Sequence, residues 1–460
     1  MMRKEQDKLE EVFIEDDKLY GIQTARAKEN FALNYRRTNL DLIYAIVKVK
    51  KAAAITYKKL GIGKPEVEEA IIKACDQVLK GNAEDQFVVD ALQGGAGTST
   101  NMNVNEVLTN LALITLGKEP GSYDIIHPLD DVNRGQSTND VYPTALRISA
   151  IEKLRTLSEA CAKLQQSLQE KETEFDHIRK LGRTELMDAV PITLGAEFGS
   201  YAQAIARDRW RLYKVEERLR QVNIGGTAVG ASHNAQRKYR YGIIEELRVL
   251  TDIGLAAAEY PMDITQNNDV FVEVSGLLKS LAVNLIKIAN DFRLMNSGPH
   301  GGFGEIKLAP MQMGSTIMPG KVNPVIAEMV VQVGFKVIAN DSAITTAAMH
   351  GEFELNAFLP LIADSLLESL ATLERAVFLF QTNCVDTLLP NQERCEELLD
   401  KSFAFATECT AKLGYDAVTK VIEECQGDTI RIKQALEMHF GGTANEIQDD
   451  STGSGRNLEQ

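Results

Sequence analysis

The chain has 460 residues, of which 44% are hydrophobic and 25% are charged, and its formal net charge at pH 7 is −15. This composition is that of a globular protein with enough chain for two or three domains. The negative charge disfavours nucleic acid and acidic membrane surfaces as partners. A small dianionic substrate is compatible with that charge only if the site supplies its own positive groups.

The cysteines and histidines give no sign of a metal site. The six cysteines form no C-x-x-C pair, and the six histidines form no H-E-x-x-H motif. Scattered cysteines of this kind predict reduced thiols and a cytoplasmic location. Residues 1–16 are charged rather than apolar, so no secretory signal is expected, and no run of apolar residues is long enough to predict a membrane span.

The N-terminal third shows helices separated by glycines. Residues 1–12 are polar and are expected to be frayed, while residues 12–14 carry a short strand signal. Apolar periodicity ended by glycine predicts helices over residues 40–60, 67–79 and 103–116.

From residue 140 to about residue 382 the sequence predicts long helices with few breaks. One stripe alternates steps of four and three residues and comprises Val274, Leu278, Leu281, Leu285, Ile288, Phe292 and Met295. Similar stripes run through residues 326–344 and 362–380. Stripes of this length suggest a helical bundle completed by other subunits, with a large monomeric core as the alternative.

The expected fold is therefore mainly α, with a long central helical bundle and smaller N- and C-terminal helical domains. The predicted divisions are an N-terminal domain at residues 1–135, the bundle at 136–383, a small helical domain at 384–440 and a disordered tail at 441–460. Within the third part, helices are expected over residues 402–413 and 415–424.

One bend between two helical patterns concentrates reactive groups. Residues 314–324 read Gly-Ser-Thr-Ile-Met-Pro-Gly-Lys-Val-Asn-Pro. The glycines allow backbone N–H groups to point at an anion, and Lys321 can neutralise a carboxylate or an enolate. An ordinary turn is the simplest alternative. A phosphate-binding loop is disfavoured, because the glycine spacing is wrong and Val322 follows Lys321 where a Ser or Thr should hold magnesium.

Three further stretches are rich in glycine, hydroxyls and amides. They begin at Thr98 (Thr-Ser-Thr-Asn), at Gly135 (Gly-Gln-Ser-Thr-Asn-Asp) and at Gly182 (Gly-Arg-Thr-Glu). Each has a simple explanation by itself, since Ser137 and its neighbours could cap a helix and Asn101 could be a turn residue.

Together these stretches resemble the aspartase/fumarase superfamily. Gly314, Ser315, Met318, Lys321 and Asn323 match its signature G-S-x-x-M-x-x-K-x-N, and residues 94–103, 127–144 and 182–191 resemble its other shared blocks. The resemblance covers residues 13–383. It implies a homotetramer with a shared central bundle, active sites drawn from three subunits, a small dicarboxylate or amino-acid substrate, and neither a cofactor nor a metal.

The resemblance also implies roles for particular residues. Ser315 would be the base that removes the Cβ proton, leaving a carbanion that spreads into the neighbouring carboxylate as an aci-form dianion. Its alkoxide would need backbone N–H groups and nearby positive charge. Donors to the substrate carboxylates would be Thr138, Thr184, Thr316, Lys321 and Asn323. The groups around the leaving amine would be Thr98, Ser137 and Asn139.

The block at residues 94–99 is closer to the aspartate ammonia-lyases than to the fumarases of the superfamily. The expected reaction is thus the reversible elimination of ammonia from L-aspartate, giving fumarate. Two alternatives stay open: a carbon–nitrogen lyase of the same fold acting on a different or N-substituted amino acid, and fumarate hydratase.

The departures from the family pattern include two single positions and one loop. Glu185 stands where His or Gln is usual, and its carboxylate would favour a cationic amine over water as the leaving group. Asp131 replaces the His of fumarases, which makes a fumarase-type second anion site doubtful. Residues 230–234 also differ from the usual loop sequence, so the shape of the substrate is open.

Overall fold

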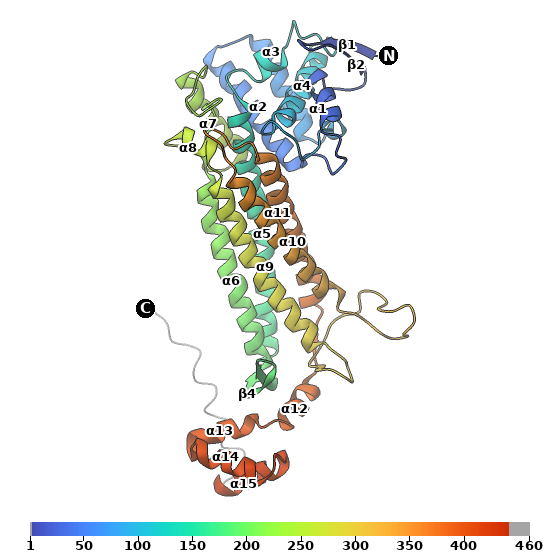
Figure 1. The fold of residues 1–460 in the computed structure, drawn as a ribbon, viewed down its shortest axis with the longest axis vertical. Helices are drawn as coiled ribbons and strands as arrows, with labels where there is room; N and C mark the ends of the chain where they lie inside the picture. The colour runs from blue at the N-terminus through green and yellow to red at the C-terminus, as the bar shows by residue number, and fades with distance from the viewer. Residues whose placement is uncertain (1, 441–460) are drawn as a thin grey trace. The chain divides into compact units, whose positions relative to one another are not determined.

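A computed structural model describes residues 2–440 and is built mainly from α-helices, as the sequence predicted (Figure 1). The expected tail at residues 441–460 lies outside the described part. Within residues 2–440, no helix has the length and apolar character needed to cross a membrane.

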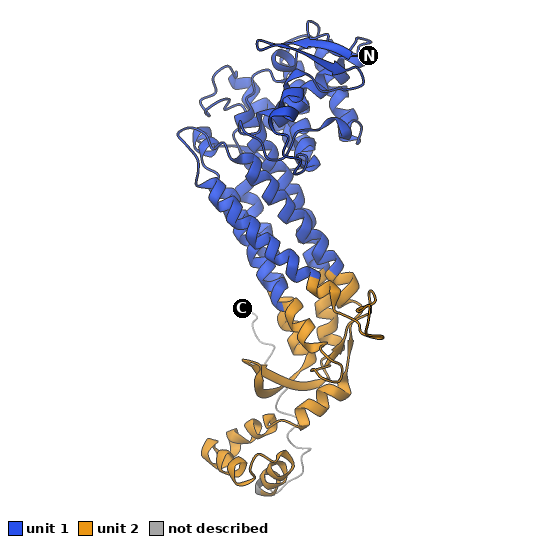
Figure 2. Cartoon of the chain, turned by 45° about the vertical axis from the view of Figure 1, so that its right-hand side comes forward, with its two compact units in different colours: residues 1–163, 205–287, 329–379 blue, residues 164–204, 288–328, 380–460 orange. Residues whose placement is uncertain are grey.

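The chain folds into two compact units (Figure 2). The first unit takes the residues up to 163 together with residues 205–287 and 329–379, and the second takes residues 164–204 and 288–328 and the chain from residue 380 onward. Five long helices contribute residues to both units: α5 (Thr138–Glu174), α6 (Leu194–Leu219), α9 (Asp269–Met295), α10 (Val325–Ala348) and α11 (Leu359–Phe380).

The remaining elements are shorter. Those of the first unit are β1 (Met2–Gln6), β2 (Glu11–Glu15), α1 (Ile22–Asn30), α2 (Leu40–Leu60), α3 (Pro65–Leu79), η1 (Glu84–Gln86), α4 (Thr98–Thr115), η2 (Pro128–Val132), β5 (Gln221–Val222), α7 (Arg237–Thr251), β6 (Ala256–Ala257) and α8 (Pro261–Gln266). Those of the second unit are β3 (Arg179–Thr184), β4 (Met187–Thr193), β7 (Ile306–Lys307), η3 (Gln381–Val385), β8 (Leu389–Pro390), α12 (Gln392–Asp400), α13 (Ala404–Leu413), α14 (Tyr415–Glu424) and α15 (Thr429–Phe440).

The polar N-terminus is a β-hairpin, so the expectation that residues 1–12 are frayed was wrong. Strands β1 and β2 pair antiparallel from Met2 opposite Glu15 to Gln6 opposite Glu11. One polar residue of β1 is held inward: the side chain of Glu5 is buried, and its Oε2 accepts a 2.8 Å hydrogen bond from the N–H of Ile22. Composition alone does not reveal such partners, which lie well beyond the strand in sequence.

Helix α2 has the bounds that the sequence predicted. The side-chain oxygen of Asn39 accepts a hydrogen bond from the N–H of Asp41 at the start of α2, and Gly61 ends the helix in the left-handed conformation, with φ of 65°. Local chemistry therefore fixes both ends, which is why the prediction succeeded here.

The apolar stripes form the core of the long helices. All seven residues of the α9 stripe, from Val274 to Met295, are at most 4% exposed. The α11 stripe is buried in the same way, with Leu366 and Leu370 fully enclosed. Because the chain buries these side chains itself, the stripes of α9 and α11 do not by themselves require another subunit.

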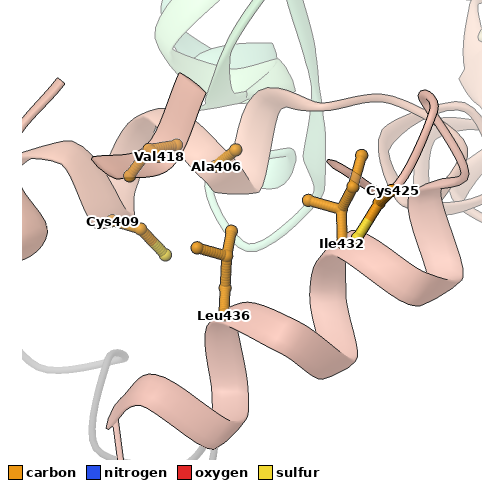
Figure 3. Close-up of a cluster of buried hydrophobic side chains, with 6 residues drawn as sticks. All are labelled: Ala406, Cys409, Val418, Cys425, Ile432 and Leu436. Atoms are coloured by element: carbon orange, nitrogen blue, oxygen red, sulfur yellow. The ribbon is translucent and has the colours of Figure 1, made fainter. Parts of the chain in front are cut away.

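The C-terminal helices α13, α14 and α15 enclose a small apolar cluster (Figure 3). Its buried members are Ala406, Cys409, Val418, Cys425, Ile432 and Leu436. Helix α14 has the predicted bounds, and helix α13 ends where predicted but begins two residues later than residue 402.

This small cluster predicts a local response to truncation. Leu436→Ala should destabilise helices α13 to α15 by about 2–5 kcal/mol, since it leaves a cavity in a core with few other contacts. Met438 lies in the same helix but is 83% exposed, so Met438→Ala is the matched control and should change little. Hydrogen exchange over residues 404–440 measures both effects, and equal protection in the two variants would contradict the prediction.

Candidate active site

The loop around Ser315 is closed by its own hydrogen bonds. The N–H of Gly314 donates to the carbonyl of Lys321 at 2.9 Å, and Asn323 Nδ2 donates to the carbonyl of Gly314 at 3.0 Å. A Cβ on Gly314 would lie 2.4 Å from the Lys321 carbonyl oxygen, so this approach excludes any other residue. Gly320 adopts φ of 79°, which L-residues rarely adopt. Both glycines therefore shape the loop that presents Ser315 and Lys321.

The oxygen of Ser315 is held by backbone donors. Ser315 Oγ accepts hydrogen bonds from the N–H of Met318 at 2.9 Å and of Ile317 at 3.2 Å. Two N–H dipoles aimed at one oxygen favour its negatively charged form, which is the environment that a serine base requires. Lys321 is exposed, and among residues 2–440 its ammonium has no hydrogen bond or ion pair.

A pocket of about 320 Å³ opens beside this serine, and the loop itself forms its walls. It is lined by Pro310, Met311, Gln312, Met313, Gly314, Ser315, Met318, Pro319, Gly320, Lys321 and Val322. Thr316, which the sequence assigned to substrate binding, is exposed and does not line it.

Thr184 and Glu185 lie at the tip of a β-hairpin that the sequence did not predict. Strands β3 and β4 pair antiparallel, with Thr184 opposite Met187, so the turn contains only Glu185 and Leu186. Both turn residues are left-handed, with φ of 54° and 65°. Two-residue turns of this kind usually carry Asn-Gly. Because Glu185 and Leu186 lack that signal, the sequence does not distinguish this stretch from the helical sequence on either side of it. The turn places the Glu185 side chain on an exposed tip.

Thr98 is positioned by a close approach between α4 and α5. Helix α4 begins at Thr98 directly after Gly97, which has φ of 92°. A Cβ on Gly97 would lie 2.3 Å from the ring of Tyr142 in α5, so only glycine fits there. The helix starts five residues earlier than predicted because tertiary contacts bind its polar side chains. One example is Asn103 Nδ2, which donates to the carbonyl of Gln86 at 3.0 Å.

Ser137 caps helix α5, which is one of the interpretations that the sequence left open. Ser137 Oγ accepts a hydrogen bond from the N–H of Asn139 at 3.2 Å, and Asp140 Oδ1 accepts one from the N–H of Ser137 at 2.9 Å. Thr138 is buried, and its Oγ1 accepts a 3.1 Å hydrogen bond from Asn101 Nδ2. The first and second polar stretches are thus joined directly.

A proline inside α5 ties the same helix start to a distant loop. Pro143 has no N–H, so the carbonyl of Asn139 loses its helical partner. Asn223 Nδ2 donates to that carbonyl at 3.0 Å, and Asn139 Nδ2 donates to the carbonyl of Ala228 at 2.8 Å. The Asn139 amide is therefore oriented from the 223–228 loop.

Asp140 completes this connection. Its Oδ2 accepts hydrogen bonds from the N–H groups of Gly225 at 3.0 Å and Thr227 at 2.9 Å. Burial raises the pKa of Asp140 to about 6, although the backbone donors and the nearby Lys50 act in the opposite direction. The buried carboxylate serves as an internal anchor between the start of α5 and residues 225–227.

Lys50 is a buried cation that the sequence analysis missed. It is 1% exposed, and its Nζ donates to Asn133 Oδ1 at 2.8 Å and to Gln136 Oε1 at 3.0 Å. Asn133 Oδ1 also accepts from Asn101 Nδ2 at 3.2 Å. Burial lowers the pKa of Lys50 to about 7, opposed in part by Asp140. The sequence feature that could have revealed Lys50 as buried is its position on the apolar face of α2, between Val47 and Ala54.

Asp131 and the 230–234 loop, which depart from the family pattern, both contact residues near the second polar stretch. Asp131 lies in η2, and it accepts hydrogen bonds from the N–H of His127 at 2.8 Å and from Arg134 Nη2 at 2.6 Å. The 230–234 loop lies beside the second polar stretch, since a Cβ on Gly135 would be 3.7 Å from the Asn234 carbonyl oxygen.

The ten candidate residues fall into two sets. The first unit holds Thr98, Ser137, Thr138 and Asn139, and the second holds Thr184, Glu185, Ser315, Thr316, Lys321 and Asn323. Within the described part of the second unit, no hydrogen bond or ion pair joins the hairpin tip to the Ser315 loop. Across residues 2–440, no three His, Cys, Asp or Glu side chains are grouped to hold a metal ion.

The family model described as "Lyase" matches residues 10–339, most of this chain. The chain therefore belongs to this family of lyases.

Individual relatives narrow the class further. The chain is 43% identical to an aspartate ammonia-lyase from Bacillus sp, over 94% of this chain and 92% of the relative. A fumarate lyase:delta crystallin from Brucella melitensis, bound to cobalt, superposes with a TM-score of 0.92 and 44% identity over 97% of both chains. A class II fumarase from Schistosoma mansoni superposes with a TM-score of 0.91 and 31% identity over 95% of this chain and 96% of that one. This protein is a carbon–nitrogen lyase of the aspartase/fumarase superfamily.

The environment of Lys50 predicts a pH-dependent stability. Because its folded pKa lies below that of a free lysine, the unfolded chain binds a proton that the native state does not. The free energy of unfolding should therefore rise with pH above about 7, by up to about 5 kcal/mol at 1.36 kcal/mol per pKa unit.

Urea unfolding at several pH values, followed by circular dichroism, measures this contribution. Lys50→Met should remove this contribution to the pH dependence of the free energy of unfolding. Lys51→Met removes a neighbouring lysine that pairs with Asp76 and is the matched control. A pH dependence that is the same in all three proteins would contradict the prediction.

Proposed function

We propose that this lyase catalyses the reversible elimination of ammonia from L-aspartate, giving fumarate. The observation that carries the proposal is the hydroxyl oxygen of Ser315, held by two backbone N–H groups in a loop that also presents Lys321. The relatives named aspartate ammonia-lyase support the choice of amine.

In this mechanism Ser315, as its alkoxide, takes the Cβ proton of the substrate. The electron pair of the C–H bond moves first into the adjacent carboxylate and forms an aci-form dianion. It then forms the Cα–Cβ double bond as the C–N bond breaks and the amine leaves with its bonding pair. Preorganised donors around the dianion lower this barrier by several kcal/mol. The reaction moves only a proton and an amine, so we propose no cofactor.

The other candidate residues would bind the two ends of the substrate. We assign contacts to the substrate carboxylates to Thr138, Thr184, Thr316, Lys321 and Asn323. We assign the surroundings of the leaving amine to Thr98, Ser137 and Asn139. In the chain as described, Asn323 and Asn139 already donate one side-chain hydrogen bond each, and these bonds fix the direction of their amides.

We further propose that the enzyme is a homotetramer whose active sites are shared between subunits. The two sets of candidate residues lie in different units of one chain. Large apolar side chains also lie exposed on the long helices: Trp210 is 63% exposed and Tyr213 70% on α6, and Phe335 is 58% exposed on α10. Side chains of this kind on long helices support contact with further copies of the chain.

We place the enzyme in the cytoplasm. All six cysteines are free and buried in the described structure, which suits a reducing compartment. The net charge of −15 argues against nucleic acid or an acidic membrane surface as a partner.

One alternative has a specific observation in its favour. Glu185 occupies an exposed hairpin tip, where its carboxylate can meet an amine larger than ammonia. An N-substituted aspartate or another amino acid would then be the substrate of the same chemistry. Fumarate hydratase is a weaker alternative, supported by the likeness to a fumarase at 31% identity.

Ultraviolet absorbance of fumarate tests the proposed reaction. L-aspartate should yield fumarate with the wild-type enzyme, and Ser315→Ala should lower kcat by about 10²–10⁴-fold, the range expected for removal of a general base. Ser200→Ala, an exposed serine on α6, is the control and should keep full activity. Fumarate from L-malate alone would instead show a hydratase. No fumarate from either substrate would point to a different amine.

The reverse reaction tests Glu185. With fumarate and a panel of amines, Glu185→Gln should lower kcat/KM for cationic amines by about fivefold, as for an exposed ion pair. Asp188→Asn removes another exposed carboxylate of the same hairpin and should have no such effect. Unchanged kinetics of Glu185→Gln with every accepted amine would remove Glu185 from the site.

A further inference from the structure

A chain of side-chain amides links the first two polar stretches and begins at a buried lysine. Lys50 Nζ donates to Asn133 Oδ1 at 2.8 Å, and the same oxygen accepts from Asn101 Nδ2 at 3.2 Å. Asn101 Nδ2 also donates to Thr138 Oγ1 at 3.1 Å. All four residues belong to the first unit of one chain, so this link does not depend on how subunits share the site.

The ammonium of Lys50 sets the direction of the chain. A lysine ammonium carries donors only, so the amide that faces it must present its oxygen. The nitrogen of Asn133 agrees with that orientation, because Nδ2 donates to the carbonyl of Gln136 at 3.2 Å. Since Asn133 Oδ1 faces Asn101, the amide of Asn101 must in turn present its nitrogen. Each amide therefore has one orientation that satisfies its neighbours.

The amide of Asn101 acts through its nitrogen alone. Asn101 is 2% exposed, and its Oδ1 is buried without a hydrogen-bond partner among residues 2–440. An unpaired buried acceptor is unfavourable, so the fold gains little from this amide beyond the two bonds of its nitrogen. One of them goes to Asn133 Oδ1, which Lys50 already satisfies. The bond to Thr138 is the one that no other donor replaces.

This bond determines what the hydroxyl of Thr138 can do. A threonine hydroxyl carries one proton and can rotate it toward any nearby acceptor. Because Asn101 Nδ2 donates to Thr138 Oγ1, the proton cannot turn toward Asn101, and none of the hydrogen bonds found among residues 2–440 uses it. An ionised carboxylate only accepts hydrogen bonds, so it is the kind of group that this hydroxyl is prepared to bind.

We propose that Asn101 is a positioning residue for the lyase reaction, whose amide, directed by Asn133 and Lys50, keeps the hydroxyl proton of Thr138 free for a substrate carboxylate. The inference deepens the proposed function and rests on it, because it takes Thr138 as a carboxylate contact. In this scheme Asn101 touches neither the substrate nor the reacting atoms. The buried cation gives two neutral amides a single direction.

Two asparagines offer a matched pair of substitutions. Asn101 and Asn105 both donate Nδ2 to Asn133 Oδ1, and in both the amide oxygen is buried without a partner among the described residues 2–440. Only Asn101 also contacts Thr138. Asn101→Leu should lower kcat/KM for aspartate by about 10-fold, because a hydroxyl that binds a charged group loses its orientation. Asn105→Leu makes the same change of size and should stay within about threefold of wild type.

A double-mutant cycle separates positioning from a general structural effect. Thr138→Val keeps the shape of the side chain but has no hydroxyl to orient. Asn101→Leu should therefore lower kcat/KM by less than about twofold when it is made in Thr138→Val, since residues in contact do not contribute additively. Equal losses in both backgrounds would overturn the inference, because Asn101 would then act without Thr138. Wild-type kinetics of Asn101→Leu would overturn it as well.

Binding of fumarate, measured by calorimetry, keeps this test separate from that of the proposed reaction. Asn101→Leu should raise the Kd of fumarate by about threefold or more, and Asn105→Leu should leave it unchanged. If the wild-type enzyme releases no fumarate from aspartate, the proposed reaction fails, and the binding comparison alone decides the role of Asn101. An equal Kd in wild type and Asn101→Leu, or no binding of fumarate to wild type, would then overturn the inference.

A second variant keeps the test decisive if Asn101→Leu does not fold. Asn101→Asp has the size of the wild-type side chain but offers Thr138 an acceptor in place of a donor, so the hydroxyl proton turns inward. It should lower kcat/KM further in the presence of the Thr138 hydroxyl than in Thr138→Val. The same loss with and without that hydroxyl would contradict the proposal.

Discussion

Wherever a long helix breaks, its terminal N–H and C=O groups need new partners, and this chain places the candidate residues Ser137, Thr138 and Asn139 at such a break. At the start of α5, the carboxylate of Asp140 and the hydroxyl of Ser137 accept hydrogen bonds from N–H groups there. One turn later, Asn223 replaces the donor that Pro143 lacks. Before α10, two loop N–H groups turn toward Ser315 Oγ. The same requirement that preserves the fold therefore orients the polar groups of the site.

The electrostatics of the protein divide between a repulsive exterior and local cations. With a net charge of −15, the chain as a whole opposes an approaching dicarboxylate. Lys321 offers one positive charge beside Ser315, while Lys50 lies buried beneath the second polar stretch, held by neutral amide oxygens. Because amides accept hydrogen bonds without neutralising the ammonium, the field of a protonated Lys50 still reaches its surroundings. A cation in low dielectric acts over a longer distance than one at the surface.

The parts that the sequence predicted well depend on local chemistry. Helix α2 was bounded by the cap at Asn39 and by Gly61, and the buried stripe of α9 follows from its spacing alone. The Ser315 loop was recognised because several of its residues match the family signature. The hairpin β3–β4 escaped notice because Glu185 and Leu186 make a turn that usually needs glycine. Lys50 and Glu305 were missed for a different reason: their partners lie far away in sequence, and a single charged residue in an apolar stretch does not reveal them.

The hairpin separates a fixed base from a variable tip. At the base, the fully buried Glu305 forms ion pairs with Lys180, which is also buried, and with Arg183, which is partly buried. At the tip, Glu185 is exposed and in a strained backbone conformation of the kind that costs about 1–3 kcal/mol, which the pairing of the strands must offset. Under the proposed function, a change of side chain at position 185 would alter the charge presented to a substrate without disturbing the base. The identity of the amine could then vary within this fold while the groups assigned to the carboxylates keep their positions.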